Sequence, residues 1–367
     1  MLIYSPELLI KYKEDLKLVA SLSNLFSDSE VPLIYYRATE NIYCECFGAT
    51  NVSRNDSTAD AVIGTVGVGI KTFLNTTRNQ KIAEFNRQAP LYSGLGGINL
   101  AKKISELRNE RISFAMRIYN LNHMIYHCVV RGPNKIEIFE EPLLPVDIST
   151  LELLAETDKK ICFKDKYETY EFYFAKSTLF KQFNLEKPIL SLGVKILENP
   201  MEQLRTLLNT VERYYPNREH HYMKSYNEES LIIPLYSVKK GIRFVGEKSG
   251  LNQWNAGGRK RDKDEIYIPY PAKIRKECQT FFPSREEKWK MKIPNGNVIS
   301  MKVCQESGKA LMSDPNKALG KWLLREVLGL QPHELLTYDK LLKIGIDSVI
   351  IKKKHKLYSI DFVEFEE

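Results

Sequence analysis

The chain has 367 residues and a mass of 42.5 kDa, a length that favours two domains over one. Apolar residues make up 43% of the sequence, and 20 Tyr with 16 Phe supply material for packed cores. This composition excludes a globally disordered protein. No apolar run approaches the roughly 18 residues that a membrane span needs, so we expect no membrane-spanning segment.

The N-terminal sequence and the cysteines favour a cytoplasmic protein. MLIYSPELLIKYKED has no basic start, long apolar core or small-residue cleavage site, so no signal peptide is expected. The six cysteines are scattered and form neither a disulfide framework nor a CxxC pair.

The excess positive charge lies in the C-terminal part of the chain. Residues 220–367 contain 27 Lys and Arg against 19 Asp and Glu, a net charge of +8, whereas residues 1–219 are neutral. A basic domain joined to a neutral one indicates either a module that binds a polyanion such as nucleic acid or a solvated basic surface.

The N-terminal part alternates between helical and extended patterns. Leucines and other apolar residues recur at spacings of three and four up to about residue 30, which predicts a helix. LIYYRATENIYCECF (33–47) has aromatic and β-branched character and favours a strand with Cys44 and Cys46 on one face. ADAVIG (59–64) and VGIKTFL (68–74) are short apolar runs split by glycine and predict a strand pair. The spacing over 79–86 predicts a helix.

The remaining segments predict strands followed by a linker and a second domain. Strands are expected within 112–130 and at KIEIFEE (135–141), KKICF (159–163) and YEFYF (170–174), and a helix at 201–214. PNREHHYMKSYNEES (216–230) is the candidate linker. Beyond it we expect short strands, one amphipathic helix near 319–328 and a final strand, YSIDFVEF. The sequence thus predicts an α/β (α+β) domain with a central mixed sheet over 1–222 and a mostly-β domain over 223–367.

Two residues of the predicted strand pair are suited to phosphodiester hydrolysis. This reaction needs a hard divalent cation held by carboxylates and an activated water, and a lysine near the water assists. Asp60 opens the first strand and Lys71 lies on the second. The layout resembles the PD-(D/E)XK nuclease core, in which an acid at a strand start faces a carboxylate-X-lysine on the next strand. Ala59 replaces the usual proline, and Gly69 stands where the second carboxylate belongs.

The resemblance implies that another residue supplies the second acid. In some restriction enzymes of this superfamily it lies about a dozen residues after the lysine, and Glu84 fits, with Gln80 one predicted turn earlier. Glu40 is a further supporting acid, with Glu45 as the competing choice. The expected site has Asp60 and Glu84 as Mg²⁺ ligands, Lys71 orienting and deprotonating water, and Glu40 in support. No nucleotide cofactor is expected, because GLGGIN (94–99) lacks the GK[ST] of a phosphate loop.

The C-terminal part contains two polar, basic segments suited to DNA. Arginines and lysines there can contact phosphates or guanine edges, and amides can contact adenine. The candidates in the first segment are Lys239, Arg243, Asn252, Gln253, Trp254, Asn255, Arg259, Lys260 and Arg261. Those in the second are Gln305, Lys309, Asn316, Lys317 and Lys321.

LNQWNAGGR, EIYIPYP, FFPSR, QESGKAL, NKALGKWLLR and IDF together resemble the C-terminal domain of NgoFVII-type restriction endonucleases. That domain is similar to the plant B-three transcription-factor module, a DNA-binding pseudobarrel. The resemblance spans about residues 232–367 and implies an N-arm (about 239–261) and a C-arm (about 305–321) that embrace the major groove. Many members carry a phospholipase-D-like catalytic domain with HxK motifs, and this sequence has none.

The sequence as a whole predicts a type II-like restriction endonuclease that cuts double-stranded DNA with Mg²⁺, leaving 5′-phosphate and 3′-hydroxyl ends. Cutting both strands implies a homodimer or successive nicking. Two alternatives stay open: a modification-dependent nuclease that recognises 5-methylcytosine, and a DNA-binding regulator without catalytic activity, which Gly69 permits.

Overall fold

The computed structural model describes residues 4–53, 58–214, 229–252 and 262–364. The chain forms two compact units, one of residues 1–116 and 121–221 and the other of residues 117–120 and 222–367. Within the described residues, no helix is both long enough and apolar enough to span a membrane.

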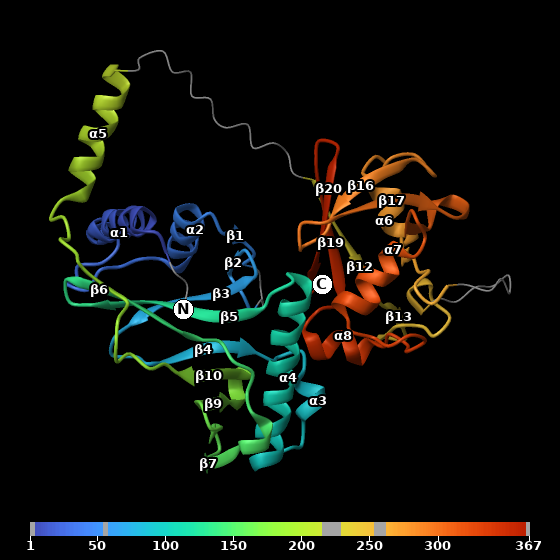
Figure 1. Ribbon diagram of the computed structural model, residues 1–367, viewed down its shortest axis with the longest axis horizontal. Helices are drawn as coiled ribbons and strands as arrows, with labels where there is room; N and C mark the ends of the chain where they lie inside the picture. Colours follow the sequence, from blue (N-terminus) through green and yellow to red (C-terminus); the bar gives the residue numbers. More distant parts are fainter. Residues whose placement is uncertain (1–3, 54–57, 215–228, 253–261, 365–367) are drawn as a thin grey trace. The chain divides into compact units, whose positions relative to one another are not determined.

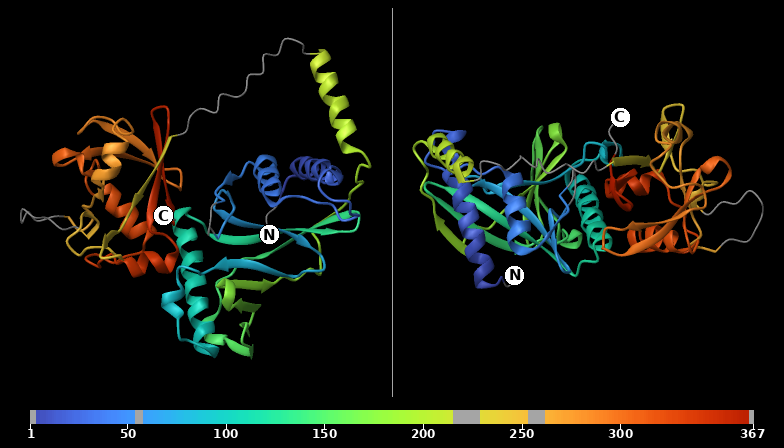
Figure 2. Two further views of the ribbon diagram at one scale, coloured as in Figure 1. Left: turned by 180° about the vertical axis from the view of Figure 1, so that it is seen from behind. Right: turned by 90° about the horizontal axis from the view of Figure 1, so that it is seen from above.

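The first unit is organised around a six-stranded mixed sheet, shown in Figures 1 and 2. Its order is β1-β2-β3-β5-β6-β11; β3 and β5 run parallel and the other neighbours run antiparallel. The strands are β1 (Thr50–Asn51), β2 (Ala61–Ile63), β3 (Val66–Leu74), β5 (His123–Gly132), β6 (Lys135–Pro142) and β11 (Leu190–Gly193).

Two helices cover one face of this sheet, α1 (Pro6–Ser21) and α2 (Tyr36–Phe47). α1 begins where Ser5 accepts a hydrogen bond from the backbone of Leu8, and Pro6 supplies a preset first helical residue. Tyr12, Leu16 and Ala20 recur every four residues and are buried against the sheet. This layer fixes the position of α2, which carries one of the candidate acids.

A second, five-stranded antiparallel sheet lies on the other side, in the order β4-β10-β9-β8-β7. The long helix α4 (Gly97–Ile118) packs on it through Leu100, Ile104 and Leu107, and the short helix α3 (Ala89–Tyr92) precedes α4. The helix α5 (Pro200–Tyr214) follows the sheets. The strands are β4 (Asn79–Glu84), β7 (Glu152–Glu156), β8 (Lys160–Lys164), β9 (Thr169–Tyr173) and β10 (Thr178–Gln182).

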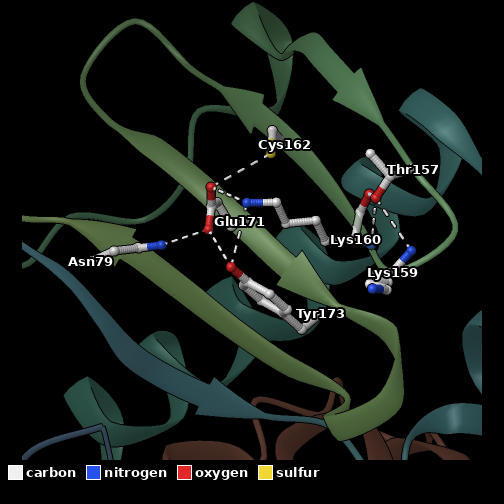
Figure 3. Close-up of polar contacts among 7 residues, drawn as sticks. All are labelled: Asn79, Thr157, Lys159, Lys160, Cys162, Glu171 and Tyr173. Atoms are coloured by element: carbon white, nitrogen blue, oxygen red, sulfur yellow. Dashed lines mark hydrogen bonds and ion pairs between the residues drawn. The ribbon is translucent and has the colours of Figure 1, made fainter. Parts of the chain in front are cut away.

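A polar network fixes the start of β4 on the outer face of the second sheet (Figure 3). The carboxylate of Glu171 on β9 accepts hydrogen bonds from Asn79 (2.6 Å), Lys160 (2.6 Å) and Tyr173 (2.9 Å). Cys162 donates a longer one at 3.7 Å. Because these partners come from β4, β8 and β9, the network holds β4 within the second sheet, although β4 directly follows β3 of the first.

The second unit is built on a curved seven-stranded sheet in the order β12-β19-β20-β16-β17-β18-β15, with a separate β13–β14 hairpin. Its aromatic core includes Phe282, which stacks on Trp289 with ring centres 5.2 Å apart. Its helical segments are α6 (Ala272–Glu277), α7 (Ala318–Gly320), a π-helical turn (Lys321–Val327) and α8 (Tyr338–Ile344). The strands are β12 (Glu229–Pro234), β13 (Ser237–Lys239), β14 (Ile242–Phe244), β15 (Ile268–Pro269), β16 (Lys288–Lys292), β17 (Val298–Cys304), β18 (Ala310–Ser313), β19 (Ser348–Lys354) and β20 (Leu357–Val363).

Most of the expected elements are confirmed, and three expectations are wrong. Residues 36–47 form a helix, so Cys44 and Cys46 do not lie on a strand; Thr39, Tyr43 and Cys46 are buried at helical spacing. The segment 79–84 is a strand, because it pairs with β10, far along the chain. Residues 112–118 continue α4, and the strand begins only at His123. Most of the expected linker lies outside the described residues.

Candidate active site and DNA-binding surface

Asp60 and Lys71 are brought together by the β2–β3 hairpin. The hairpin pairs Ala61 with Val68, and Asp60 extends the pairing by donating its backbone N–H to the carbonyl of Val68 at 2.8 Å. The Asp60 carboxylate accepts a hydrogen bond from the backbone N–H of Ile70 at 2.7 Å. The acid is therefore tied to the residue next to Lys71, and the two charged side chains act on each other electrostatically.

The surroundings of Asp60 disfavour its charged form. The pKa of the Asp60 carboxyl is raised to about 6, chiefly by burial and in part by the nearby charge of Glu40. Lys71, the Ile70 hydrogen bond and Arg37 act in the opposite direction. Ionising the buried Asp60 carboxyl costs free energy. A bound cation would stabilise the ionised form and offset this cost.

Lys71 is held in a neighbourhood that favours its neutral amine. Burial lowers the pKa of Lys71, and the positive charges of Arg108 and Lys81 lower it further, while Asp60 opposes this shift. Its amine makes no hydrogen bond or ion pair with any residue that the structure describes. A lowered pKa makes the neutral form of Lys71 more accessible, and that form can accept a proton from water, as the expected role requires.

Glu40 lies beside Asp60, whereas Glu45 points away. Glu40 is buried on α2 and accepts a hydrogen bond from the Arg37 guanidinium at 2.8 Å. The hydroxyl of the adjacent Thr39 bonds that of Thr72 on β3 at 3.1 Å, which fixes α2 against the strand of Lys71. Glu45 is exposed and pairs with Lys11 at 3.0 Å. The geometry therefore favours Glu40 over Glu45 as the supporting acid.

Glu84 was expected to lie on a helix. It lies instead on the strand β4 of the second sheet. Its carboxylate is partly exposed and pairs with Lys81 at 2.7 Å. Gln80, on the same strand, bonds the carbonyl of Thr77. The charge of Lys81, the partner of Glu84, acts on Lys71.

A second carboxylate at position 69 of β3 would come into tight contact with the ring of Tyr126. Tyr126 lies opposite Gly69 on β5, and a Cβ atom at position 69 would lie 3.2 Å from its ring. The Tyr126 hydroxyl accepts a hydrogen bond from the buried Arg108 at 2.7 Å, and Arg108 also reaches Thr58 at 3.3 Å. Gly69 therefore faces the ring of Tyr126, and Arg108 holds that ring in place.

The donor set fits a hard divalent cation of the kind expected. Asp60 and Glu40 offer carboxylate oxygens, and Mg²⁺ commonly takes one or two carboxylates and keeps several waters. No group of three or more His, Cys, Asp or Glu residues placed to hold a metal occurs among the described residues. The charge of Glu40 acts on Asp60, whereas Glu84 lies on β4 and pairs with Lys81.

Sequence reasoning did not identify Arg37, Arg108 or Tyr126 as part of this neighbourhood. Arg37 precedes Glu40 by three residues, a helical spacing that was hidden because the segment was expected to be a strand. Arg108 lies on α4, whose C-terminal part was also expected to be a strand. The periodicity of buried residues along α2 is the signal that could have identified Arg37.

Much of the expected N-arm lies outside the described residues, namely Gln253, Trp254, Asn255, Arg259, Lys260 and Arg261. Lys239 is exposed on β13. Arg243 on β14 pairs with Asp347 at 3.1 Å and lies over the ring of Tyr236. The Asn252 amide donates to the carbonyls of Gly246 and Leu336 and accepts from the Leu336 N–H, so it joins two backbone segments.

The expected C-arm presents several exposed cations. Lys309 follows the short turn between β17 and β18, and Gln305, at the start of that turn, has a left-handed backbone (φ 66°). Asn316 is half-buried, and Lys321 is exposed. Lys317 pairs with Asp262 at 3.3 Å, which joins the base of the C-arm to the segment that follows the N-arm.

Residues 222–355 match the family model of the NgoFVII C-terminal B3-like DNA-binding domain. No curated protein matches the chain. The match covers most of the second unit, and the curved sheet fits a B3-like pseudobarrel. It indicates that the C-terminal part binds DNA and suggests a role in restriction.

Proposed function

We propose that this protein is a sequence-specific, Mg²⁺-dependent endonuclease that cuts double-stranded DNA, as type II restriction endonucleases do. The C-terminal unit would recognise a short sequence and the first unit would hydrolyse the phosphodiester bond. The observation that carries this proposal is the grouping of Asp60, Lys71 and Glu40 around the β2–β3 hairpin. It stands in a chain whose other unit matches a DNA-binding domain of a restriction enzyme.

The chain's own residues have distinct parts in the proposed reaction. Asp60 and Glu40 would hold Mg²⁺, which supplies charge neutralisation at the phosphate. Lys71, whose pKa is lowered by burial, would orient the attacking water and, in its neutral form, accept the water's proton. Attack of the water in line with the leaving oxygen would break the P–O3′ bond, and the departing 3′ oxygen would take a proton from solvent water, giving 5′-phosphate and 3′-hydroxyl ends. Arg108 holds Tyr126, and its positive charge adds to the effect of burial in lowering the pKa of Lys71.

Digestion of phage DNA tests the proposal. The full chain is incubated with unmethylated and with cytosine-methylated DNA, in Mg²⁺ and in EDTA. Discrete bands that require Mg²⁺ are expected, and they should be lost in Asp60→Asn and in Lys71→Gln. Lys187→Gln, which removes an exposed lysine of the same unit, is the matched control and should cut normally. Glu84→Gln measures whether the acid on β4 is needed.

One observation favours a second candidate, a DNA-binding regulator without catalytic activity. Gly69 stands at the position of the second carboxylate, and the Tyr126 ring leaves little room for one. If neither DNA is cut in Mg²⁺ but both are shifted in a gel, the regulator is favoured. Cutting of the methylated DNA alone would instead identify a modification-dependent nuclease.

A further inference from the structure

An apolar cavity of about 600 Å³ lies on the helix-covered face of the first sheet. Its walls come from the end of α1, the turn that follows, and the segment leading into α2. The apolar side chains that line it include Val19, Leu22, Leu25, Phe26, Leu33 and Ile34. Its size falls within the range of small-molecule sites, roughly 300 to 1,000 Å³.

Arg131 of β5 supplies a cation to this cavity. One Nη atom donates a hydrogen bond to the carbonyl of Pro32 at 3.1 Å. The Nε atom is buried and has no hydrogen-bond partner among the described residues. No acidic side chain of the described residues pairs with the guanidinium. Burial lowers the pKa of Arg131, but a guanidinium stays charged in proteins.

The Arg131 guanidinium lies in an otherwise apolar wall and has no acidic partner among the described residues. This combination favours a ligand that has both an anionic group and an apolar body. Arg131 is half-buried, and a guanidinium that is partly removed from water is stabilised by a counter-charge. A guanidinium binds a carboxylate through parallel hydrogen bonds, while the apolar walls accept a hydrocarbon. We propose that this cavity is a binding site for a small amphiphilic anion with an apolar body and a single carboxylate.

The cavity is lined in part by residues that are close in sequence to the candidate catalytic groups. Thr72, which follows Lys71, and Ala38, which lies two residues before Glu40, both line the cavity. Thr72 is also hydrogen-bonded to Thr39 of α2. A ligand here would contact both elements that carry those groups. The binding proposal itself does not depend on nuclease activity.

Calorimetric titration of the full chain with octanoate and with 1-octanol tests the proposal. Octanoate should bind with one site per chain. Arg131→Gln should weaken octanoate binding by about tenfold or more, because a hydrogen-bonded charge pair is lost, and leave 1-octanol binding unchanged. Ala38→Phe fills the cavity and should weaken both. Arg78→Gln, which neutralises an exposed arginine of the same unit, should change neither.

Three outcomes would overturn the proposal. Octanoate fails to bind the wild-type chain, or it binds the wild type and Arg131→Gln equally, or it binds Ala38→Phe with unchanged affinity. Circular dichroism and thermal unfolding of each variant show that a loss of binding is not a loss of folding. Light scattering after size exclusion adds a check: if octanoate does not bind and Ala38→Phe dissociates a dimer, the cavity belongs to an interface between two copies.

Discussion

The backbone N–H of Ile70 donates a 2.7 Å hydrogen bond to the carboxylate of Asp60, so the candidate acid is fixed to the strand that carries Lys71. This bond joins the residue before β2 to β3. It leaves the second carboxylate oxygen available to a cation while opposing the rise in the Asp60 pKa that burial causes. Asp60 and Lys71 are therefore held together by contacts within one hairpin.

The two acids of α2 should differ in their effect on cleavage. Glu40→Gln removes a buried carboxylate beside Asp60 and should lower Mg²⁺ affinity and cleavage by at least roughly tenfold. Glu45→Gln changes an exposed residue of the same helix and should leave both unchanged. Cleavage rate against Mg²⁺ concentration is the measurement. Equal losses in the two variants would show that Glu40 has no special part.

Asp60→Asn should stabilise the protein in the absence of metal. The pKa of Asp60 is about 6 in the folded protein, above its ordinary value of 3.8. The folded state therefore holds this proton more tightly, and the stability that this provides is lost as pH rises through 6. At pH 8 in EDTA the asparagine variant should unfold with a free energy higher by on the order of 1 to 3 kcal/mol.

Unfolding of the wild type and of Asp60→Asn also tests whether Asp60 binds the metal. The stability difference should shrink as pH falls from 8 towards 4, where both side chains are neutral, as measured by urea unfolding. Adding Mg²⁺ should raise the unfolding temperature of the wild type but not of Asp60→Asn, since a ligand stabilises only the form that binds it. An equal Mg²⁺ effect on both proteins would remove Asp60 from the metal site.

Placing a carboxylate at position 69 should not improve the proposed cleavage. Gly69→Asp would press a Cβ atom against the ring of Tyr126 at 3.2 Å and should destabilise the protein by about 1–3 kcal/mol. Gly69→Ala isolates the contribution of the Cβ atom, because it adds no charge. Urea unfolding and cleavage rates are the measurements. Faster cleavage by Gly69→Asp without loss of stability would show that the ring can move aside.

The parts of the site that could be predicted from sequence are those fixed by local contacts. Asp60 and Lys71 belong to one hairpin whose two apolar runs and glycines are visible in the sequence. Glu84 was placed on the wrong kind of element because β4 pairs with β10, about a hundred residues later, and local spacing does not show that pairing. Arg108 and Tyr126 lie on the consecutive elements α4 and β5, and their contact was missed because the C-terminal part of α4 was expected to be a strand.

The exposed lysines of the C-arm should contribute to the salt dependence of DNA binding. Each phosphate contact adds about 0.9 to the slope of log affinity against log salt, so Lys321→Gln and Lys309→Gln should each lower the slope by about one. Lys317→Gln should have a smaller effect, because its ammonium already pairs with Asp262. Lys356→Gln removes an exposed lysine outside both arms and serves as the control. Fluorescence anisotropy between 50 and 200 mM salt gives the slopes, and an unchanged slope for both Lys309 and Lys321 variants would place the DNA on another surface.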